Sequence, residues 1–394
     1  MFQDLKDKIE ILENTEENIL KCVDKIENNE LLIFPSENVY QIGCNCFSEI
    51  AVKNIYKLKK KNINQSLTLN VLDYDMLQSF VEVNNFEDVI IKKLMDLYWP
   101  GPLTFILKNK NKNLDHLVKI NKNNCDCILI TCPENESMQK IIKKTYLPII
   151  STSANLSGKI PAVEYSHAIK YFKKDKITLL KGATNPKYCV ENTVVSLEKL
   201  NFNSNKYNLI IEKKGNITKK MIQKSLSNFE IQIFYRTDLN KKEVVNSKLN
   251  DDKKNKINHL NSGIDSRIDS INFEKKIILF NFIESSHIKL GQFEENIKQS
   301  VNSYLSVCAL IDFNSRNFKY RNKFSAYVDL SEKGDIKEAL FNFYNVIHQL
   351  NEINEVKNIL IFNYYDEKKE LYSSLYDLIN KFSKFSKTLI PLFK

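Results

Sequence analysis

Short apolar runs alternate with amphipathic stretches along the first 236 residues, and this alternation predicts strands separated by helices. Strands are expected at the apolar runs 31–34, 66–71, 103–107, 127–131, 147–151, 177–180, 192–197 and 207–212. Amphipathic spacing predicts helices at 3–28, 48–60, 74–82, 86–98, 135–145 and 163–173. Apolar strands interleaved with helices indicate an α/β sheet that is buried by its helices.

Residues 237–275 interrupt this pattern with a polar, charged stretch of low complexity, which is typical of a linker. After it, apolar runs return at 277–283, 304–311, 324–330 and 358–362, with helical spacing at 292–303, 335–350 and 367–384. The sequence therefore predicts a first domain over 1–236, a linker over 237–275 and a second α/β domain over 276–394.

Glycine is scarce, and its placement excludes two kinds of nucleotide site. The chain has 8 glycines among 394 residues, and no two lie closer than Gly158 and Gly182. A G-x-G-x-x-G fingerprint and a G-x-x-x-x-G-K-[ST] loop are both impossible with this spacing, so a nucleotide would need other phosphate ligands. The net charge of +10 favours polyanions, but the basic residues are spread along the chain.

The N-terminus MFQDLKDKIEIL has no apolar signal core, and no run reaches the roughly 18 apolar residues of a membrane span. We therefore expect a cytoplasmic protein with reduced thiols and no membrane contact. Two C-x-C pairs, Cys44/Cys46 and Cys125/Cys127, could present two thiolates on one strand face or simply fill the core. Because structural zinc normally uses C-x-x-C spacing, we assign no metal site to them.

Four short segments carry polar or rigid residues around the expected strands and helices: PSENVYQIG (35–43), KLKKKN (57–62), WPGPLT (99–104) and STSANLSG (151–158). Polar groups that follow strands lie where open α/β sheets bind ligands. The lysines either neutralise a helix C-terminus or clamp phosphate. WPGPLT is typical of a rigid turn, and the Ser/Thr/Asn segment either binds phosphate and ribose or caps turns.

The order of these segments, followed by ENTVVSL and KKGNIT, resembles the YrdC-like family of L-threonylcarbamoyladenylate synthases. WPGPLT and SANLSG are the most specific of the shared segments, and the resemblance covers over half of the chain. The long form of that family also has a linker and a C-terminal α/β domain, as this chain does. The resemblance implies a YrdC-like twisted mixed sheet with a large concave cavity, and a smaller, Rossmann-like C-terminal domain.

The resemblance implies a nucleotidyltransferase that joins L-threonine, bicarbonate and ATP into threonylcarbamoyl-AMP and releases pyrophosphate. Mg²⁺ would arrive with ATP, and neither a tightly bound cofactor nor a protein-held metal is expected. A partner transferase would then place the threonylcarbamoyl group on tRNA beside the anticodon. Further expected ligands are tRNA or double-stranded RNA. The alternative interpretation is a catalytically lapsed YrdC-like protein that binds ATP or RNA.

Site residues follow from the same resemblance, with Lys59 and Lys61 as the catalytic pair. The implied ATP ligands are Lys59, Lys61, Gln65, Cys127, Ser153, Asn155, Pro161, Asn192 and Lys213. The implied threonine ligands are Ser36, Asn38, Tyr40, Asn70, Thr131 and Ser151.

Several of these positions depart from the family pattern. Ser36 and Asn38 replace threonines, Asn70 replaces a histidine, and Asn192 stands where serine is usual. Lys61, Thr131 and Lys213 occupy arginine positions, and Ile268 and Asp269 replace His-Tyr. Lysine keeps the charge of arginine but loses the bidentate fork that suits phosphate. The sequence leaves two interpretations open, an active enzyme with an altered pocket or a binding protein that has lost the activity.

Overall fold

The computed structural model describes residues 9–114, 117, 120–122, 125–182, 191–200, 206–239, 276–284, 294–362, 375, 378–379 and 388–392. The chain divides into two compact units, residues 1–157 with 161–266 and residues 158–160 with 267–394. Residues 236–239 are helical, and the rest of the expected linker, with Ile268 and Asp269, lies outside the described residues. The domain bounds inferred from the sequence therefore stay a prediction.

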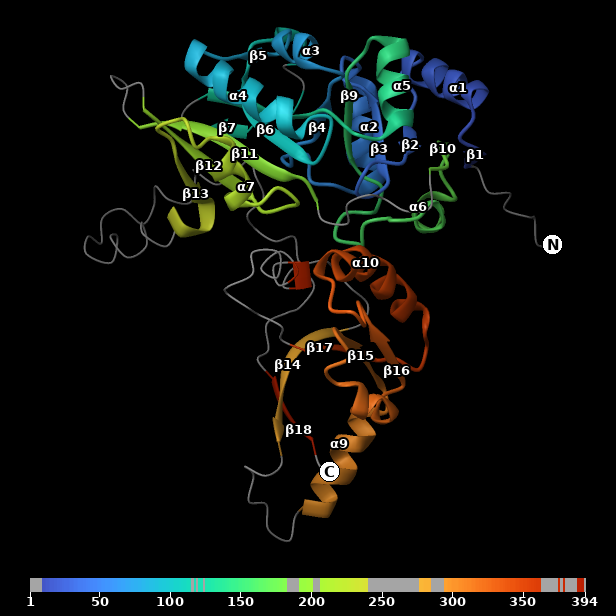
Figure 1. Ribbon diagram of the computed structural model, residues 1–394. Helices are drawn as coiled ribbons and strands as arrows, with labels where there is room; N and C mark the ends of the chain where they lie inside the picture. The colour runs from blue at the N-terminus through green and yellow to red at the C-terminus, as the bar shows by residue number, and fades with distance from the viewer. Residues whose placement is uncertain are drawn as a thin grey trace, which may run out of the picture. The chain divides into compact units, whose positions relative to one another are not determined.

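Among the described residues, the first unit is built on one mixed sheet of 13 strands, which runs through the blue-to-yellow part of the chain in Figure 1. Its order is β1-β10-β2-β3-β9-β4-β8-β6-β11-β12-β13, with β5 against β6 and β7 against β8. The strands are β1 Glu10–Leu12, β2 Leu32–Phe34, β3 Gln41–Asn45, β4 Thr68–Asn70, β5 Val81–Glu82, β6 Leu103–Asn109, β7 Ile120–Lys122, β8 Cys125–Thr131, β9 Ile149–Ser153, β10 Thr178–Leu180, β11 Thr193–Lys199, β12 Tyr207–Lys213 and β13 Gln232–Tyr235.

The helices of this unit are α1 Glu16–Glu27, α2 Glu49–Lys59, α3 Tyr74–Gln78, α4 Asn85–Tyr98, α5 Glu136–Thr145, α6 Tyr165–Phe172 and α7 Lys219–Ser225, with a 3-10 turn at Lys112–Leu114. Polar caps begin most of them; Ser48 accepts from the backbone N–H of Ala51 at 3.3 Å, for example. All eight strands expected in this part of the chain are confirmed. The sequence did not indicate β1, β3, β5, β7 or β13, which are short or partly polar.

Two helix predictions were wrong in their extent. Of the expected helix 3–28, residues 3–8 lie outside the described residues, Glu10–Leu12 forms β1 and pairs with β10, and α1 begins at Glu16. Thr15 then caps α1 by accepting from the N–H of Asn18. Ile9 and Leu12 are buried in the core in this arrangement too, so their apolar spacing fits either a strand or a helix. Likewise, the expected helix 74–82 ends at Gln78, and Val81–Glu82 forms β5 against β6.

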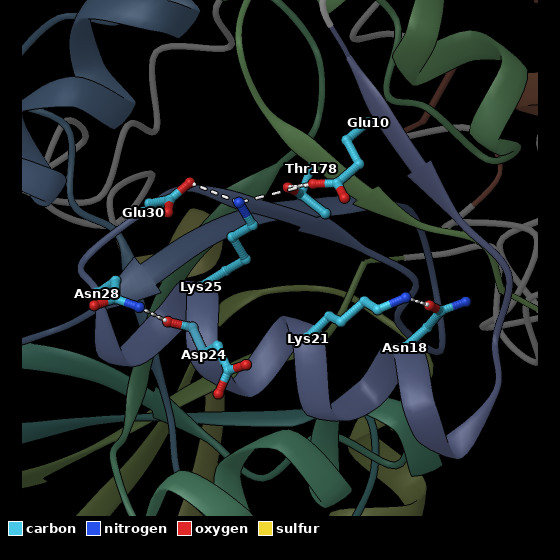
Figure 2. Close-up of polar contacts among 8 residues, drawn as sticks. All are labelled: Glu10, Asn18, Lys21, Asp24, Lys25, Asn28, Glu30 and Thr178. Carbon is cyan, nitrogen blue, oxygen red and sulfur yellow. Dashed lines mark hydrogen bonds and ion pairs between the residues drawn. The ribbon is translucent and has the colours of Figure 1, made fainter.

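Polar contacts fasten α1 to the edge of the sheet formed by β1 and β10 (Figure 2). Lys25 lies between two carboxylates, 3.1 Å from Glu30 and 3.8 Å from Glu10. Thr178 of β10 donates to the same Glu10 at 2.8 Å. The two carboxylates are about half exposed and Lys25 is about one-quarter exposed, so each ion pair contributes about 0–1 kcal/mol. The apolar face of α1 supplies most of its stabilisation.

In the part of the second unit that the structure describes, five strands form a parallel sheet with helices between them, shown in orange and red in Figure 1. The elements are β14 Lys276–Glu284, α9 Glu294–Leu305, β15 Cys308–Asp312, a 3-10 turn at Phe318–Lys323, β16 Ala326–Asp329, α10 Ile336–Glu352, β17 Asn358–Phe362 and β18 Thr388–Leu392. The expected α/β architecture is confirmed. Across the sheet the strands lie in the order β16-β15-β17-β14-β18. Numbered by their order in the sequence, this is 3-2-4-1-5, whereas the first five strands of the dinucleotide-binding fold lie in the order 3-2-1-4-5.

Two further expectations concern this unit. The apolar run 304–311 is only partly a strand, because Tyr304 and Leu305 end α9 and the strand begins at Cys308. The expected helix 367–384 lies mostly outside the described residues, although Leu375, Leu378 and Ile379 are helical. Within the described part of the chain, none of the helices has the length and apolar character needed to cross a bilayer.

Candidate active site

Buried polar side chains gather where several strands of the first sheet begin or end. The strand register brings them together: Asn70 of β4 lies opposite Thr131 of β8, and Thr131 lies opposite Thr104 of β6. On the other side of β4, Ser151 of β9 lies opposite Thr68. Asn70, Thr104, Thr131 and Ser151 are each at most 3% exposed. Hydrogen-bonding groups held in such a dry place are typical of a ligand site.

The loop between β2 and β3 folds back on itself beside these strands. The hydroxyl of Ser36 donates to the carbonyl of Val39 at 2.6 Å and accepts from the N–H groups of Asn38 and Val39 at 3.3 Å. The Tyr40 phenol accepts from the N–H of Gly182 at 2.7 Å. Burial raises the pKa of Tyr40 to about 12, so its O–H stays protonated at neutral pH. The predicted threonine ligands Ser36, Asn38 and Tyr40 are therefore held in one rigid turn.

Four residues, Asn38, Thr104, Thr131 and Asn192, form a hydrogen-bonded group that we call the amide cluster. The side-chain amide of Asn192 donates to the hydroxyls of Thr104 at 3.2 Å and Thr131 at 3.4 Å. The amide of Asn38 donates to the side-chain oxygen of Asn192. Thr131 in turn donates to the carbonyl of Leu103 at 2.9 Å. The cluster joins the β2–β3 loop to the ends of β6, β8 and β11.

A second hydrogen-bonded group links β3, β4 and β9. The Asn70 amide donates to the hydroxyl of Ser151 at 2.7 Å and to the carbonyl of Ile149 at 2.8 Å. Ser151 donates to the side-chain oxygen of Gln41. Every donor and acceptor in this group is neutral, so it suits a polar ligand and supplies no charge of its own.

Lys59, at the last turn of α2, is buried with its amine against the β9 end. Its side chain is 2% exposed, and its amine donates to the carbonyl of Ser153. Burial, assisted by the nearby Lys61, lowers the pKa of Lys59 well below its usual value. The N–H of Ser157 donates to the carbonyl of Lys59 at 2.8 Å. The predicted phosphate clamp and the SANLSG segment are thus in direct contact.

The other predicted ATP ligands lie in different surroundings from one another. Asn155 is 6% exposed and donates to the carbonyl of Leu156 at 2.9 Å. Gln65 is tied through its backbone carbonyl, which accepts from the phenol of Tyr56 at 2.7 Å. Cys127 lies in a small apolar cluster with Ile106 and Val194.

Pro161 is buried, and Lys61 lies two residues beyond the end of α2. Lys213, at the end of β12, forms an ion pair with Glu191. Asn192, expected at ATP, is bonded instead to Asn38 and Thr131, which were expected at threonine.

Three polar residues near the site, of which Thr104 and Glu37 are buried and Gln41 is partly buried, were not expected from the sequence, although each lies inside a segment that was quoted. Gln41 accepts from Ser151, and Thr104 accepts from Asn192. Glu37 is 5% exposed and accepts from the backbone N–H of Glu134 at 3.3 Å. Burial raises the pKa of the Glu37 carboxyl above its usual value. The sequence feature that these three residues share, and by which they could have been found, is a polar side chain within or next to an apolar strand.

The WPGPLT turn reaches the site through one carbonyl. The indole N–H of Trp99 donates to the carbonyl of Leu103 at 2.7 Å, and the same oxygen accepts from Thr131. The Trp99–Pro100 peptide bond is cis. Gly101 is needed because a β-carbon there would lie 2.7 Å from the carbonyl oxygen of Tyr98. The architectural role expected for this turn therefore includes fixing the end of β6.

The C-x-C pairs give no sign of a metal site in the described part of the chain. Cys44 and Cys46 are both fully buried in the main core, and burial raises the pKa of each thiol. Among the described residues, no group of three or more His, Cys, Asp or Glu side chains could hold a metal ion.

Comparison with known proteins gives a consistent result. A family model described as "Telomere recombination" matches residues 24–208. The chain is 30% identical over 155 residues to the threonylcarbamoyl-AMP synthase of Buchnera aphidicola subsp. Baizongia pistaciae, covering 39% of this chain and 81% of that relative. It is 31% identical over 144 residues to the threonylcarbamoyl-AMP synthase of Histophilus somni, covering 36% of this chain and 76% of that relative.

A solved structure matches both units of the chain. The crystal structure of P. abyssi Sua5 complexed with L-threonine aligns with a TM-score of 0.69 at 18% identity, covering 98% of this chain and 99% of that one. At this identity the match establishes the shared fold, including the C-terminal parallel sheet. Together with the relatives above, it shows that this chain belongs to the YrdC/Sua5 family of threonylcarbamoyl-AMP synthases.

Proposed function

We propose that this chain is a threonylcarbamoyl-AMP synthase whose reaction takes place between Lys59 and the polar ends of β4, β8 and β9. The observation that carries the proposal is the contact between the buried Lys59 amine and the carbonyl of Ser153. It places a cation-forming side chain beside the SANLSG segment in a chain that has no glycine-rich phosphate loop. A lysine at such a place is a suitable ligand for the phosphates of ATP.

The reaction requires positioning and charge neutralisation more than covalent catalysis. The amine of L-threonine attacks the carbon of bicarbonate-derived CO₂ and loses a proton, which gives a carbamate. A carbamate oxygen then attacks the α-phosphorus of ATP, and the bond between that phosphorus and the α,β-bridging oxygen breaks, so that pyrophosphate leaves. Lys59, Lys61 and Lys213 would neutralise the charge on the phosphates, while the buried strand ends exclude water from the carbamate.

The lowered pKa of Lys59 fits this role. Burial favours the uncharged amine in the free enzyme, and a phosphate placed next to it favours the ammonium form. Binding of ATP beside Lys59 would therefore raise the pKa of its amine again. Mg²⁺ enters as the MgATP substrate, held chiefly by the phosphate oxygens, as is usual for this ion.

The amino acid would bind among neutral donors and acceptors. Ser36, Asn38, Asn70, Thr131 and Ser151 line the strand ends and are each at most 5% exposed. With threonine in place of arginine at 131, the substrate carboxylate would be bound by amide, hydroxyl and backbone donors. We expect weaker binding of L-threonine than in relatives that keep the arginine, because a charged hydrogen bond contributes about 1.5–3 kcal/mol.

We further propose that the product serves tRNA modification in the cytoplasm. A mixed anhydride of a carbamate and AMP is an activated acyl donor, so a transferase must consume it before water does. That transferase, and through it the tRNA, are the proposed partners of this chain. The net charge of +10 is compatible with a transient encounter with RNA.

The test is pyrophosphate release from MgATP and bicarbonate, with L-threonine, with L-serine and without an amino acid. Release that depends on both L-threonine and bicarbonate, together with the mass of threonylcarbamoyl-AMP, is the expected result. Absence of release from folded protein that still binds ATP would instead support the lapsed binding protein, which Thr131 in the arginine position favours.

A further inference from the structure

The amide cluster combines three positions at which this sequence departs from the family pattern. Asn38, Thr131 and Asn192 stand where threonine, arginine and serine are usual. They are far apart in the chain, with sequence separations of 154 for Asn38 and Asn192 and 61 for Thr131 and Asn192. In the folded chain they are hydrogen-bonded to one another, and Thr104 completes the group.

The hydrogen bonds of the cluster are complementary. Asn192 uses its amide hydrogens on two hydroxyls and its oxygen on the amide of Asn38. Thr131 accepts a hydrogen bond from Asn192 and donates one from its hydroxyl to the carbonyl of Leu103. Changing any one member would leave a buried donor or acceptor of the others unsatisfied, which costs about 1–3 kcal/mol.

Burial makes the cluster sensitive to charge and size. Asn38 is 5% exposed, and Thr104 and Thr131 are each 3% exposed. An arginine at 131 would bring a longer, charged side chain into the space where the Asn192 amide now contacts both threonines. A charged arginine at 131 and the present neutral contacts of Asn192 with the two threonines therefore exclude each other. Replacement of Thr131 by arginine alone is incompatible with asparagine at 192.

The cluster also controls the loop that carries the expected amino-acid ligands. Asn38 lies between Ser36 and Tyr40 in the β2–β3 loop, and its bond to Asn192 fastens that loop to the start of β11. The same asparagine fixes the ends of β6 and β8 through their threonines. A shift of this loop would move the side chains that are expected to contact the amino acid.

We propose that Asn38, Thr104, Thr131 and Asn192 act as one unit that sets the amino-acid selectivity of the site, with Asn192 as its positioning residue. This inference rests on the proposed synthase activity. It predicts that the three departures are coupled, so that their separate effects on catalysis do not add.

The experiment compares Asn192→Ser, Thr131→Arg and the triple variant Asn38→Thr/Thr131→Arg/Asn192→Ser in the full-length chain. Steady-state pyrophosphate release gives kcat and KM for L-threonine, L-serine and ATP, and thermal melting checks folding. Thr237→Arg is the matched control, because it adds the same side chain at an exposed position.

We expect Asn192→Ser to change the ratio of kcat/KM for L-threonine over L-serine by about fivefold or more, with the KM for ATP within about twofold of wild type. Thr131→Arg alone should lower kcat/KM for L-threonine by about tenfold or more, and the triple variant should recover most of that loss. Thr237→Arg should match the wild type.

Three results would overturn the inference. One is an unchanged threonine-to-serine ratio in Asn192→Ser, and another is a change confined to the KM for ATP. The third is Thr131→Arg improving the use of L-threonine by itself. If Thr131→Arg does not fold, Asn192→Ser decides alone, since serine is smaller than asparagine and still offers a hydrogen-bonding group at that position. Absence of threonine-dependent release from the wild type would overturn the synthase proposal itself, which separates the two failures.

Discussion

Both sheets of this protein end in buried polar side chains, but the two groups satisfy their hydrogen bonds over very different distances along the chain. In the second unit, Asp312 at the end of β15 accepts from the N–H of Asn317 at 2.7 Å, from its side-chain amide at 3.0 Å, and from the phenol of Tyr327 at 2.7 Å. These partners lie at most 15 residues away. In the first unit, Asn38 is bonded to Asn192, 154 residues away.

The second sheet repeats the local pattern at Asp329. This carboxylate accepts from the N–H groups of Ser315 at 2.6 Å and Ser331 at 2.8 Å, and thereby closes the loops that follow β15 and β16. Local partners of this kind finish turns, whereas the long-range partners in the first sheet hold separate strands and a loop in register. Similar polar residues at strand ends therefore stabilise loops in the second unit and form a candidate site in the first.

The largest loss of activity is expected on substitution of Lys59, because this lysine lies in the candidate site of the first unit. Lys59→Ala should lower kcat/KM for ATP by about 10²–10³-fold, because it removes a buried cation next to the phosphates. Lys53→Ala is the matched control on the same helix, since Lys53 is exposed and pairs with nearby Glu49. Equal activity of the two variants in the pyrophosphate assay would remove Lys59 from the catalytic site.

In the second unit, removal of the Asp312 carboxylate is expected to destabilise the fold. Asp312→Ala should lower the free energy of unfolding by about 1–3 kcal/mol, because the buried N–H groups and the phenol lose their acceptor. Denaturant unfolding measures this loss, with the exposed Glu332→Ala as control. The threonine-to-serine selectivity should stay unchanged; a shift in selectivity would show that Asp312 does more than close a loop.

The buried state of Lys59 also predicts a pH dependence of stability. Because its pKa is lowered in the folded protein, the unfolded chain binds one more proton between that pKa and the usual value near 10.4. The contribution of Lys59 to the free energy of unfolding should therefore rise as the pH rises through that window, by at most about 1.4 kcal/mol per pH unit. Unfolding of wild type and Lys59→Met between neutral and alkaline pH measures the difference. Parallel profiles would mean that Lys59 is charged in the free enzyme.

The smallest effect is expected at Lys213, where the ion pair with Glu191 is about one-third exposed on both sides. Lys213→Ala should change the free energy of unfolding by less than about 1 kcal/mol, because such a pair is screened by water. It should raise the KM for ATP by a few fold at most, and the exposed Lys220→Ala provides the control. A loss as large as that of Lys59→Ala would contradict this ranking.

Most of the first sheet was predictable because its strands are short, continuous apolar runs between turn residues. The errors came from places where one pattern suits two structures, as at Glu10–Leu12, which pairs with β10 although its spacing fits a helix. β3 was missed because PSENVYQIG looks like a polar loop, and the strand begins only at Gln41.

The site was predictable in part from its segments. Lys59 and Ser153 were both expected at ATP, and they are in contact. The grouping of Asn192 with Asn38 and Thr131 was not predictable, because three substitutions far apart in the sequence give no sign of their common place in the fold.

The sequence by itself determined the α/β class, the absence of a glycine-rich phosphate loop, and the family of the chain through segments such as WPGPLT and SANLSG. Those features depend on local composition and on the order of residues. The tertiary structure alone decided which polar residues share a buried network, since that depends on strand register and on burial. The pKa of Lys59 and the neutrality of the amide cluster are properties of the packed sheet, because desolvation acts only once the strands have assembled.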